Sequence, residues 1–240
     1  MYNYFIILVC LIGIQTSKAQ SLTASELLEK SIGYHDPGNL WNVFQGKLFI
    51  TMNYPDGKER HSEVEIDLPK QHFEITSTTA DNTIKQTIDK EDCTLKLNGS
   101  TTLSEEDMKK HQLSCDRTKM MKNYYTYLYG LPMKLKDKGT NLDPKVHTKT
   151  FKGKEYLVLK VTYDESVGKD VWYFYFDPIS YAMEVYQFFH DESKNDGEYI
   201  LLTELENVGT IKMPKIRAWY YNKNDKHLGT DILMKGITLE

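Results

Sequence analysis

A hairpin pattern decides the fold at residues 45–68, which read QGKLFITMNYPDGKERHSEVEIDL. Apolar residues alternate in both halves of this stretch, and a turn signal, Pro55-Asp56-Gly57, lies between them. The alternating residues are Leu48, Ile50, Met52 and Tyr54, then Val64, Ile66 and Leu68. Because strict alternation is typical of half-buried strands, the stretch predicts two antiparallel strands joined by a tight turn.

The same pattern continues on both sides of a central interruption. Three more short strands follow at 73–75, 84–88 and 93–97, and strands resume near Val146. Later strands are predicted at 156–163, 171–176, 181–189, 198–205, 215–221 and 228–234. Two of these, 156–163 and 171–176, are apolar on both faces and should therefore be central strands covered on both sides. We expect about eleven strands in an antiparallel sheet.

Helical patterns lie before the strands and in the interruption. Thr23 or Ser25 can cap a first helix, which should end at the Asp36-Pro37-Gly38 turn. In the interruption, one helix should start at residues 104–107, and a second should start at Asp116 and run over 117–129. Since a large twisted sheet curls, the pattern predicts an α+β fold in which an N-terminal helix and a helical insert cover the concave face of the sheet.

This order of elements resembles a known architecture. A helix, a Phe44-Gln45-Gly46 entry into the first strand, five strands, a helical insert and further strands are similar to the lipoprotein-carrier (lipoprotein-sorting protein) fold. More closely, the chain resembles an exported flavobacterial-type family known as a domain of unknown function, on NYYTYLYGLP (123–132), WYFYFDP (172–178) and FKGKEY (151–156). The resemblance implies a half-barrel with a hydrophobic cavity under its helices, and it carries no catalytic residues with it.

The N-terminus has the features of a secretion signal. Residues 5–14 form an apolar run that is too short for a membrane span, and Ser17 and Ala19 place small residues before a cleavage site. No Lys or Arg precedes the run, so an uncleaved anchor is the alternative. We predict cleavage after Ala19, export to the periplasm or beyond, and one domain over residues 20–240. No second long apolar run follows, so no transmembrane segment is expected in the mature chain.

Two cysteines remain once the signal is removed, Cys93 and Cys115. In an oxidising compartment such a pair is expected to form a disulfide, which would stabilise the fold by about 3 kcal/mol. The alternative interpretation is a reactive thiol at Cys115 near a helix start, although no Cys-x-x-Cys motif is present. The disulfide is favoured.

Composition and motifs argue against several classes of function. The chain has 30 Lys and Arg against 34 Asp and Glu, a net charge of −4, and loss of Lys18 with the signal makes it −5. A mildly acidic protein is not expected to bind nucleic acid. The seven histidines are scattered singly, and no nucleophile elbow or phosphate loop is present. No catalytic residue, metal or cofactor is therefore predicted.

Aromatic residues give the candidate site. The predicted ligand-binding residues are Met120, Met121, Tyr124, Tyr125 and Leu128 on one helix face, with Trp172, Phe174 and Phe176 on the sheet. Methionine and tyrosine suit an adaptable apolar pocket, although ordinary core packing explains any one of them equally well.

Together these features favour an exported, non-enzymatic binder or carrier of a lipid or other hydrophobic ligand in the cell envelope. Two alternatives stay open. The first is a structural or protein-interaction envelope module whose core is solid. The second is a hydrolase whose site is assembled from dispersed residues.

Overall fold

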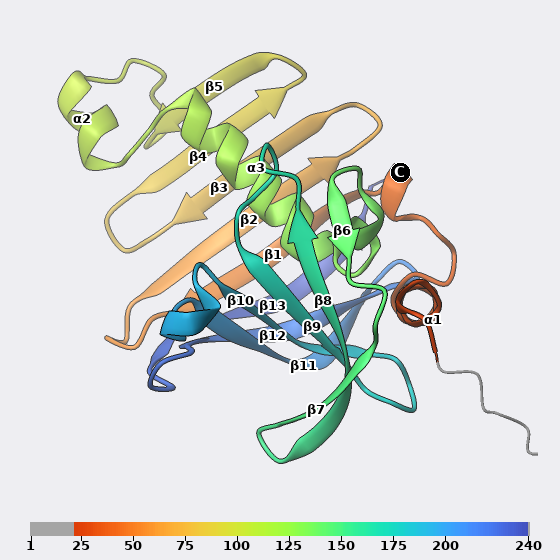
Figure 1. The fold of residues 1–240 in the computed structure, drawn as a ribbon. Helices are drawn as coiled ribbons and strands as arrows, with labels where there is room; N and C mark the ends of the chain where they lie inside the picture. The colour runs from red at the N-terminus through yellow and green to blue at the C-terminus, as the bar shows by residue number, and fades with distance from the viewer. Residues whose placement is uncertain (1–21, 240) are drawn as a thin grey trace, which may run out of the picture.

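The computed structural model describes residues 22–239, and the predicted signal at residues 1–19 lies outside them. Within that range thirteen strands form one open antiparallel sheet (Figure 1). The strands are β1 (Gln45–Asn53), β2 (Glu59–Asp67), β3 (His72–Thr78), β4 (Thr83–Asp89), β5 (Asp92–Leu97), β6 (Thr140–Leu142), β7 (His147–Phe151), β8 (Lys154–Tyr163), β9 (Val171–Phe176), β10 (Met183–Phe189), β11 (Glu198–Val208), β12 (Ile211–Tyr221) and β13 (His227–Thr238). The helices are α1 (Ala24–His35), α2 (Glu105–Lys110) and α3 (Cys115–Gly130), with short 3-10 turns at Trp41–Val43, Met133–Lys136 and Glu192–Lys194.

The hairpin predicted from residues 45–68 is present as β1 and β2. Leu48 pairs with Val64 across it, and both side chains are fully buried. The other edge of β1 pairs with β13, so the first and last strands of the chain lie side by side. This pairing joins β2–β5 on one side to β8–β12 on the other, in the order β5-β4-β3-β2-β1-β13-β12-β11-β10-β9-β8-β6.

The predicted count of about eleven strands is slightly low. Strands resume near Val146 as expected, with β7, but the three-residue β6 before it was not predicted. Strands β6 and β7 both pair with the ten-residue strand β8, opposite Val161–Tyr163 and Lys154–Val158 respectively. Neither strand contains a fully buried side chain. A three-residue strand shows too little apolar alternation to be recognised in the sequence.

The predicted first helix is α1, and its cap is Thr23 rather than Ser25. The Thr23 hydroxyl accepts from the Glu26 backbone amide at 3.2 Å, and the Glu26 carboxylate accepts from the Thr23 amide at 2.8 Å. This reciprocal capping box satisfies two of the amides that a helix start leaves unpaired. Leu27 and Leu28 are buried on the face toward the sheet.

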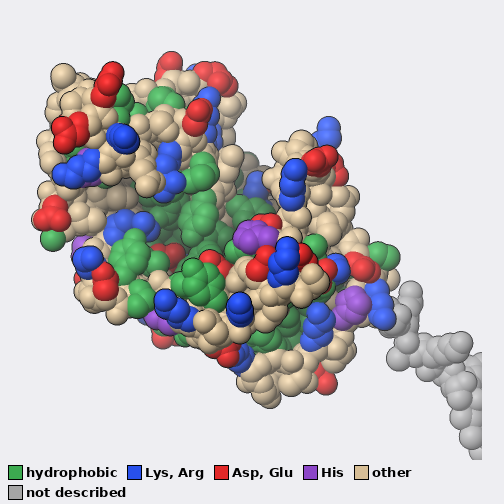
Figure 2. Space-filling view, turned by 60° about the vertical axis from the view of Figure 1, so that its left-hand side comes forward, with side chains coloured by type: hydrophobic (Ala, Val, Ile, Leu, Met, Phe, Trp, Pro, Cys, Tyr) green, Lys and Arg blue, Asp and Glu red, His purple; other side chains and the backbone are tan. Residues whose placement is uncertain are grey.

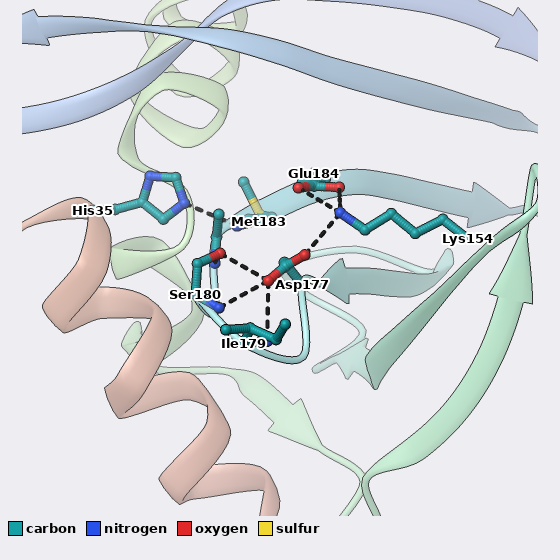
Figure 3. Close-up of polar contacts among 8 residues, drawn as sticks. His35, Lys154, Asp177, Ile179, Ser180, Met183 and Glu184 are labelled. Atoms are coloured by element: carbon teal, nitrogen blue, oxygen red, sulfur yellow. Dashed lines mark hydrogen bonds and ion pairs between the residues drawn. The ribbon is translucent and has the colours of Figure 1, made fainter.

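The last residue of α1 fixes the helix to the sheet. Nδ1 of the buried His35 ring lies 2.7 Å from the Lys212 carbonyl. The other ring nitrogen, Nε2, accepts from the Met183 amide at 2.9 Å (Figure 3). Since Nε2 accepts, Nδ1 carries the proton and donates to Lys212, so the ring is neutral. Burial lowers the pKa of His35 to about 4.

The turn between β9 and β10 lies beside this contact. Asp177 accepts from the backbone amides of Ile179 and Ser180, and Lys154 reaches both Asp177 and Glu184 at 2.7–2.9 Å (Figure 3). The Lys154 ammonium and the backbone amides lower the pKa of Asp177. These bonds hold β8, β9 and β10 in register at the end that α1 contacts.

The helical insert differs from the prediction in where its second helix begins. Helix α3 starts at Cys115 instead of Asp116, because the Ser114 hydroxyl caps it by accepting from the Arg117 amide at 3.1 Å. The predicted disulfide is confirmed: Cys93 of β5 is bonded to Cys115, with their Cα atoms 5.8 Å apart. The bond attaches the start of α3 to the edge of the sheet.

Of the two helices of the insert, the long helix α3 is the one that covers the sheet. It crosses one face of the sheet over β1–β4, whereas α2 lies beyond β5 and has no buried residue (Figure 1). The buried Thr118 hydroxyl donates to Gln86 of β4 at 2.9 Å, and the ring of Tyr125 packs against Phe73 of β3. The face under α1 and α3 is therefore the concave, core face.

Strand β9 is covered on both sides, as predicted. Phe174 and Phe176 belong to the main core under the helices, and Tyr173 and Tyr175 belong to a second apolar cluster on the opposite face. Within residues 22–239, no helix has both the length and the apolar character that crossing a bilayer requires.

Candidate ligand-binding pocket

A pocket of about 600 Å³ lies between α3 and the concave face of the sheet. Its walls come from α3 and from seven strands on both sides of the β1–β13 junction. Figure 2 shows a hollow on this face that is lined with apolar side chains and surrounded by charged ones. The residues around the pocket are Met52, Arg60, Arg117, Met120, Met121, Tyr124, Tyr125, Tyr127, Leu128, Trp172, Phe188, Glu198, Trp219, Leu228 and Asp231.

All five candidate residues of α3 line this pocket. Met120 and Tyr124 are about half exposed, at 49% and 40%, whereas Tyr125 and Leu128 are almost fully buried. Positions three or four apart share a helix face, which explains why these residues meet the same space. Met120 and Tyr124 are therefore the accessible part of the α3 wall, and Tyr125 and Leu128 are its packed part.

The three candidates of β9 have different positions. Trp172 lines the pocket and stacks on Phe188 of the neighbouring strand, with ring centroids 4.8 Å apart. Phe174 and Phe176 point to the same side of the strand, but they are fully buried in the main core and are not among the pocket-lining residues. The structure thus brings six of the eight candidates together and places the other two in the core.

Sequence reasoning missed the residues that the other half of the sheet supplies. Met52 could have been recognised, because it continues the alternation of Leu48 and Ile50 onto the same face. Arg60 and Asp231 could not, since charged residues in a strand pattern are normally read as pointing outward. Only the register of β2, β1, β13 and β12 places them on the concave face.

Register also aligns a row of charged residues across the sheet. Arg60 pairs with Met52, Met52 with Asp231, and Asp231 with Arg217, on four adjacent strands. Arg217 and Asp231 are 1% and 7% exposed. Burial raises the pKa of Asp231, and the positive charges of Arg60 and Arg217 oppose that rise without cancelling it. We call these three charged residues the Arg-Asp-Arg row.

The Arg217 guanidinium has few partners of its own. One nitrogen, Nη1, donates to the Pro214 carbonyl at 2.8 Å, and the guanidinium carbon lies 3.9 Å from the centre of the Tyr129 ring. A cation over an aromatic face is stabilised by the ring's quadrupole. The contact explains how α3 covers a buried positive charge, but it leaves the Nε and Nη2 atoms without a hydrogen-bond partner in the described structure.

A second pocket of about 530 Å³ adjoins the first. The two share Tyr127 and Trp172, whose rings form a wall between them. The Tyr127 hydroxyl is hydrogen-bonded to that of Tyr163. The second pocket is more polar, and its other residues are Asn123, Thr126, Lys134, Asp137, Ser166, Val167, Gly168 and Asp170.

The first pocket offers little for covalent chemistry. Among the described residues that line it there is no His, Ser or Cys. No group of three or more His, Cys, Asp or Glu side chains suited to a metal occurs within residues 22–239. The arrangement can bury an apolar ligand and hydrogen-bond a polar group at the Arg-Asp-Arg row.

Comparison with solved structures identifies the fold. A LolA superfamily protein from Nitrosomonas europaea superimposes with a TM-score of 0.54 at 13% identity, over 92% of this chain and 94% of that one. A putative outer membrane lipoprotein-sorting protein domain from Vibrio parahaemolyticus gives a TM-score of 0.47 at 9% identity, over 89% and 93%. The first likeness confirms the predicted lipoprotein-carrier architecture and extends to the fold alone.

Comparison by sequence identifies the family. No curated protein matches the chain. One family model matches residues 2–236, nearly the whole sequence, and it agrees with the resemblance noted on residues 123–132 and 172–178. The chain belongs to DUF6503, a family of unknown function.

Proposed function

We propose that this protein is an exported, non-enzymatic binder or carrier of a lipid or other hydrophobic ligand in the cell envelope. The observation that carries the proposal is the pocket of about 600 Å³ under α3. Its volume lies within the roughly 300–1,000 Å³ of small-molecule sites, and its lining is mainly methionine, leucine and aromatic side chains.

The energy of binding would come from burying apolar surface. Each methylene group removed from water contributes about 0.8 kcal/mol, so a chain of about ten carbons contributes roughly 8 kcal/mol before ordering costs. Met120 and Met121 can adjust to different chain shapes, because methionine has three rotatable bonds and a polarisable sulfur.

Two further observations support the proposal. The half-barrel architecture is shared with a LolA superfamily protein, which makes a carrier role a natural hypothesis for this pocket. The Cys93–Cys115 disulfide suits an oxidising compartment and so agrees with export.

The alternative of a solid core is less favoured, because the concave face is not filled by side chains. A hydrolase would need a nucleophile and a base in a cleft, and the described lining of the first pocket supplies neither His nor Ser. A module with a solid core would take up no apolar ligand, whereas a hydrolase would convert the ligand that it binds.

Ligand uptake tests the proposal directly. Delipidated protein should bind the neutral probe N-phenyl-1-naphthylamine with a change in the fluorescence of Trp172 and Trp219, and native mass spectrometry of freshly purified protein should show a co-purifying lipid. The double variant Met120→Gln/Met121→Gln should bind the probe about tenfold more weakly. Met108→Gln is the matched control, since Met108 lies on α2 and is 37% exposed. Folded protein that takes up neither probe nor lipid would rule the proposal out.

A further inference from the structure

Buried polar atoms without partners gather at one side of the apolar pocket. Within the described residues nine buried side-chain nitrogen or oxygen atoms lack a hydrogen-bond partner, and seven belong to the Arg-Asp-Arg row or to aromatic residues around it. They are Arg60 Nε, Arg217 Nε and Nη2, Asp231 Oδ1, Trp219 Nε1, Tyr129 Oη and Tyr186 Oη. Because buried polar groups are normally satisfied, such a concentration needs an explanation.

Three of these residues face the pocket itself. Arg60, Trp219 and Asp231 all line it, so their free polar atoms can reach a bound molecule. They come from β2, β12 and β13, and the charge of Arg60 and the indole of Trp219 both act on the Asp231 carboxyl. The remaining four atoms belong to Arg217, Tyr129 and Tyr186, which do not line the pocket and are at most 2% exposed.

The charged groups around the Arg-Asp-Arg row carry a net positive charge. Asp231 forms no ion pair within 4 Å with Arg217, its partner on β12, or with Arg60, which is separated from it by Met52 of β1. Arg117 at the rim and Glu198 at the opposite wall also face the pocket. The pocket lining holds two arginines and two carboxylates, and Arg217, which is buried behind it, adds one positive charge. Burial strengthens the field of that charge.

Donors also outnumber acceptors among the free atoms that line the pocket. Arg60 Nε and Trp219 Nε1 can only donate hydrogen bonds, and Asp231 Oδ1 is the one carboxylate oxygen beside them. A neutral hydrocarbon would leave these donors unsatisfied, whereas a cation would meet the same sign of charge. An anion would accept from Arg60 and Trp219 and neutralise the excess positive charge.

We propose that the ligand is an amphiphile with a single anionic head group, a carboxylate or a phosphate, whose head lies against Arg60 and Trp219 and whose apolar chain lies along the methionines and tyrosines of α3. This inference rests on the proposed function, because it names the class of hydrophobic ligand that the same pocket takes. Arg217 is a positioning residue behind the head group, since it is buried and contacts Tyr129.

A series of twelve-carbon ligands with different heads tests the inference. Dodecanoate, dodecyl phosphate, 1-dodecanol and dodecyltrimethylammonium are used as competitors of N-phenyl-1-naphthylamine, below their micelle concentrations. We expect at least one of the two anions to bind ten times more tightly than the alcohol and the cation to bind more weakly than the alcohol. The ranking of dodecanoate against dodecyl phosphate shows which acidic head the pocket takes.

Variants at Arg60 test whether the preference for anionic ligands depends on the Arg-Asp-Arg row. Arg60→Met should lower the affinity of the preferred anion about tenfold and change that of dodecanol less than threefold, and Arg60→Lys should restore part of the loss. Lys119→Met is the matched control, since Lys119 is an exposed cation of α3 that does not line the pocket; its expected effect is below threefold. Equal binding of anions and alcohol by the native protein, or an equal loss of both in Arg60→Met, would overturn the head-group inference while the proposed function stands. Absence of binding by every ligand in the series would overturn both.

Discussion

The rings of Tyr127 on α3 and Trp172 on β9 meet edge to face, with centroids 5.9 Å apart, and form the wall between the two pockets of the concave face. Edge-to-face packing of this kind stabilises a pair of rings by about 1 kcal/mol beyond their buried area. The wall is held at its other end by the hydrogen bond between the Tyr127 and Tyr163 hydroxyls. For the ligand proposed above, we therefore expect Tyr127 to limit the length of the chain that the first pocket accepts.

Removing this wall should change chain-length preference. In Tyr127→Ala the two pockets would merge, so the affinity for an eighteen-carbon chain should rise relative to a twelve-carbon chain by about tenfold, measured by competition with the fluorescent probe. Tyr127→Phe is the control, because it loses only the hydroxyl and keeps the ring that packs on Trp172; it should leave the preference within about threefold. An unchanged preference in Tyr127→Ala would show that the wall does not limit the chain.

The candidate residues that line the pocket should behave differently from those in the core. Phe174 is fully buried, so Phe174→Ala should lower the free energy of unfolding by about 3–5 kcal/mol. Met120 is half exposed, so Met120→Ala should lower it by less than about 1 kcal/mol while weakening probe binding. Urea unfolding and probe titration of both variants measure the two effects. Comparable destabilisation by the two substitutions would contradict the assignment of Met120 to the pocket wall.

Stability should fall in mild acid because of His35. Its pKa is about 4 in the folded protein and near 6.5 when the chain is unfolded, so the unfolded state binds a proton first as the pH falls. The neutral ring contributes roughly 3 kcal/mol to the free energy of unfolding. This contribution is complete above pH 6.5 and is lost as the pH falls from about 6.5 to 4.

Urea midpoints measured from pH 7 to pH 4 check this expectation. His35→Gln keeps one donor for the Lys212 carbonyl and one acceptor for the Met183 amide, but it does not titrate. The difference between the urea midpoints of the native protein and of His35→Gln should therefore become smaller as the pH falls. Parallel curves would show that His35 does not control stability in this range.

The disulfide should stabilise the attachment of α3 to the sheet. Cys93 and Cys115 are 22 residues apart, so loss of the bond in Cys93→Ser/Cys115→Ser should lower the free energy of unfolding by about 3 kcal/mol. Dithiothreitol should reproduce this loss in the native protein and have no effect on the double variant. Probe affinity should also fall, because α3 supplies one wall of the pocket. Equal stability with and without the bond would contradict this account.

Much of the fold follows from local patterns. Alternation around Leu48 and Val64 was enough to identify β1 and β2, and the spacing of Tyr124, Tyr125 and Leu128 was enough to show one apolar face on α3. Helix starts were less certain, since Ser114 and Asp116 are both good caps and only the folded backbone selects Ser114. Such patterns depend on neighbours within a few residues, which the sequence displays directly.

The sequence by itself determined the curled antiparallel sheet, the pairing of Cys93 with Cys115, and the helix face that lines the pocket. Only the tertiary structure decided that Trp172 faces the pocket while Phe174 and Phe176 lie in the core, and that Arg60, Asp231 and Arg217 form a buried row. The reason is that the row depends on which strands become neighbours. The pairing of β1 with β13 joins residues nearly two hundred positions apart, and no local pattern specifies that partner or its register.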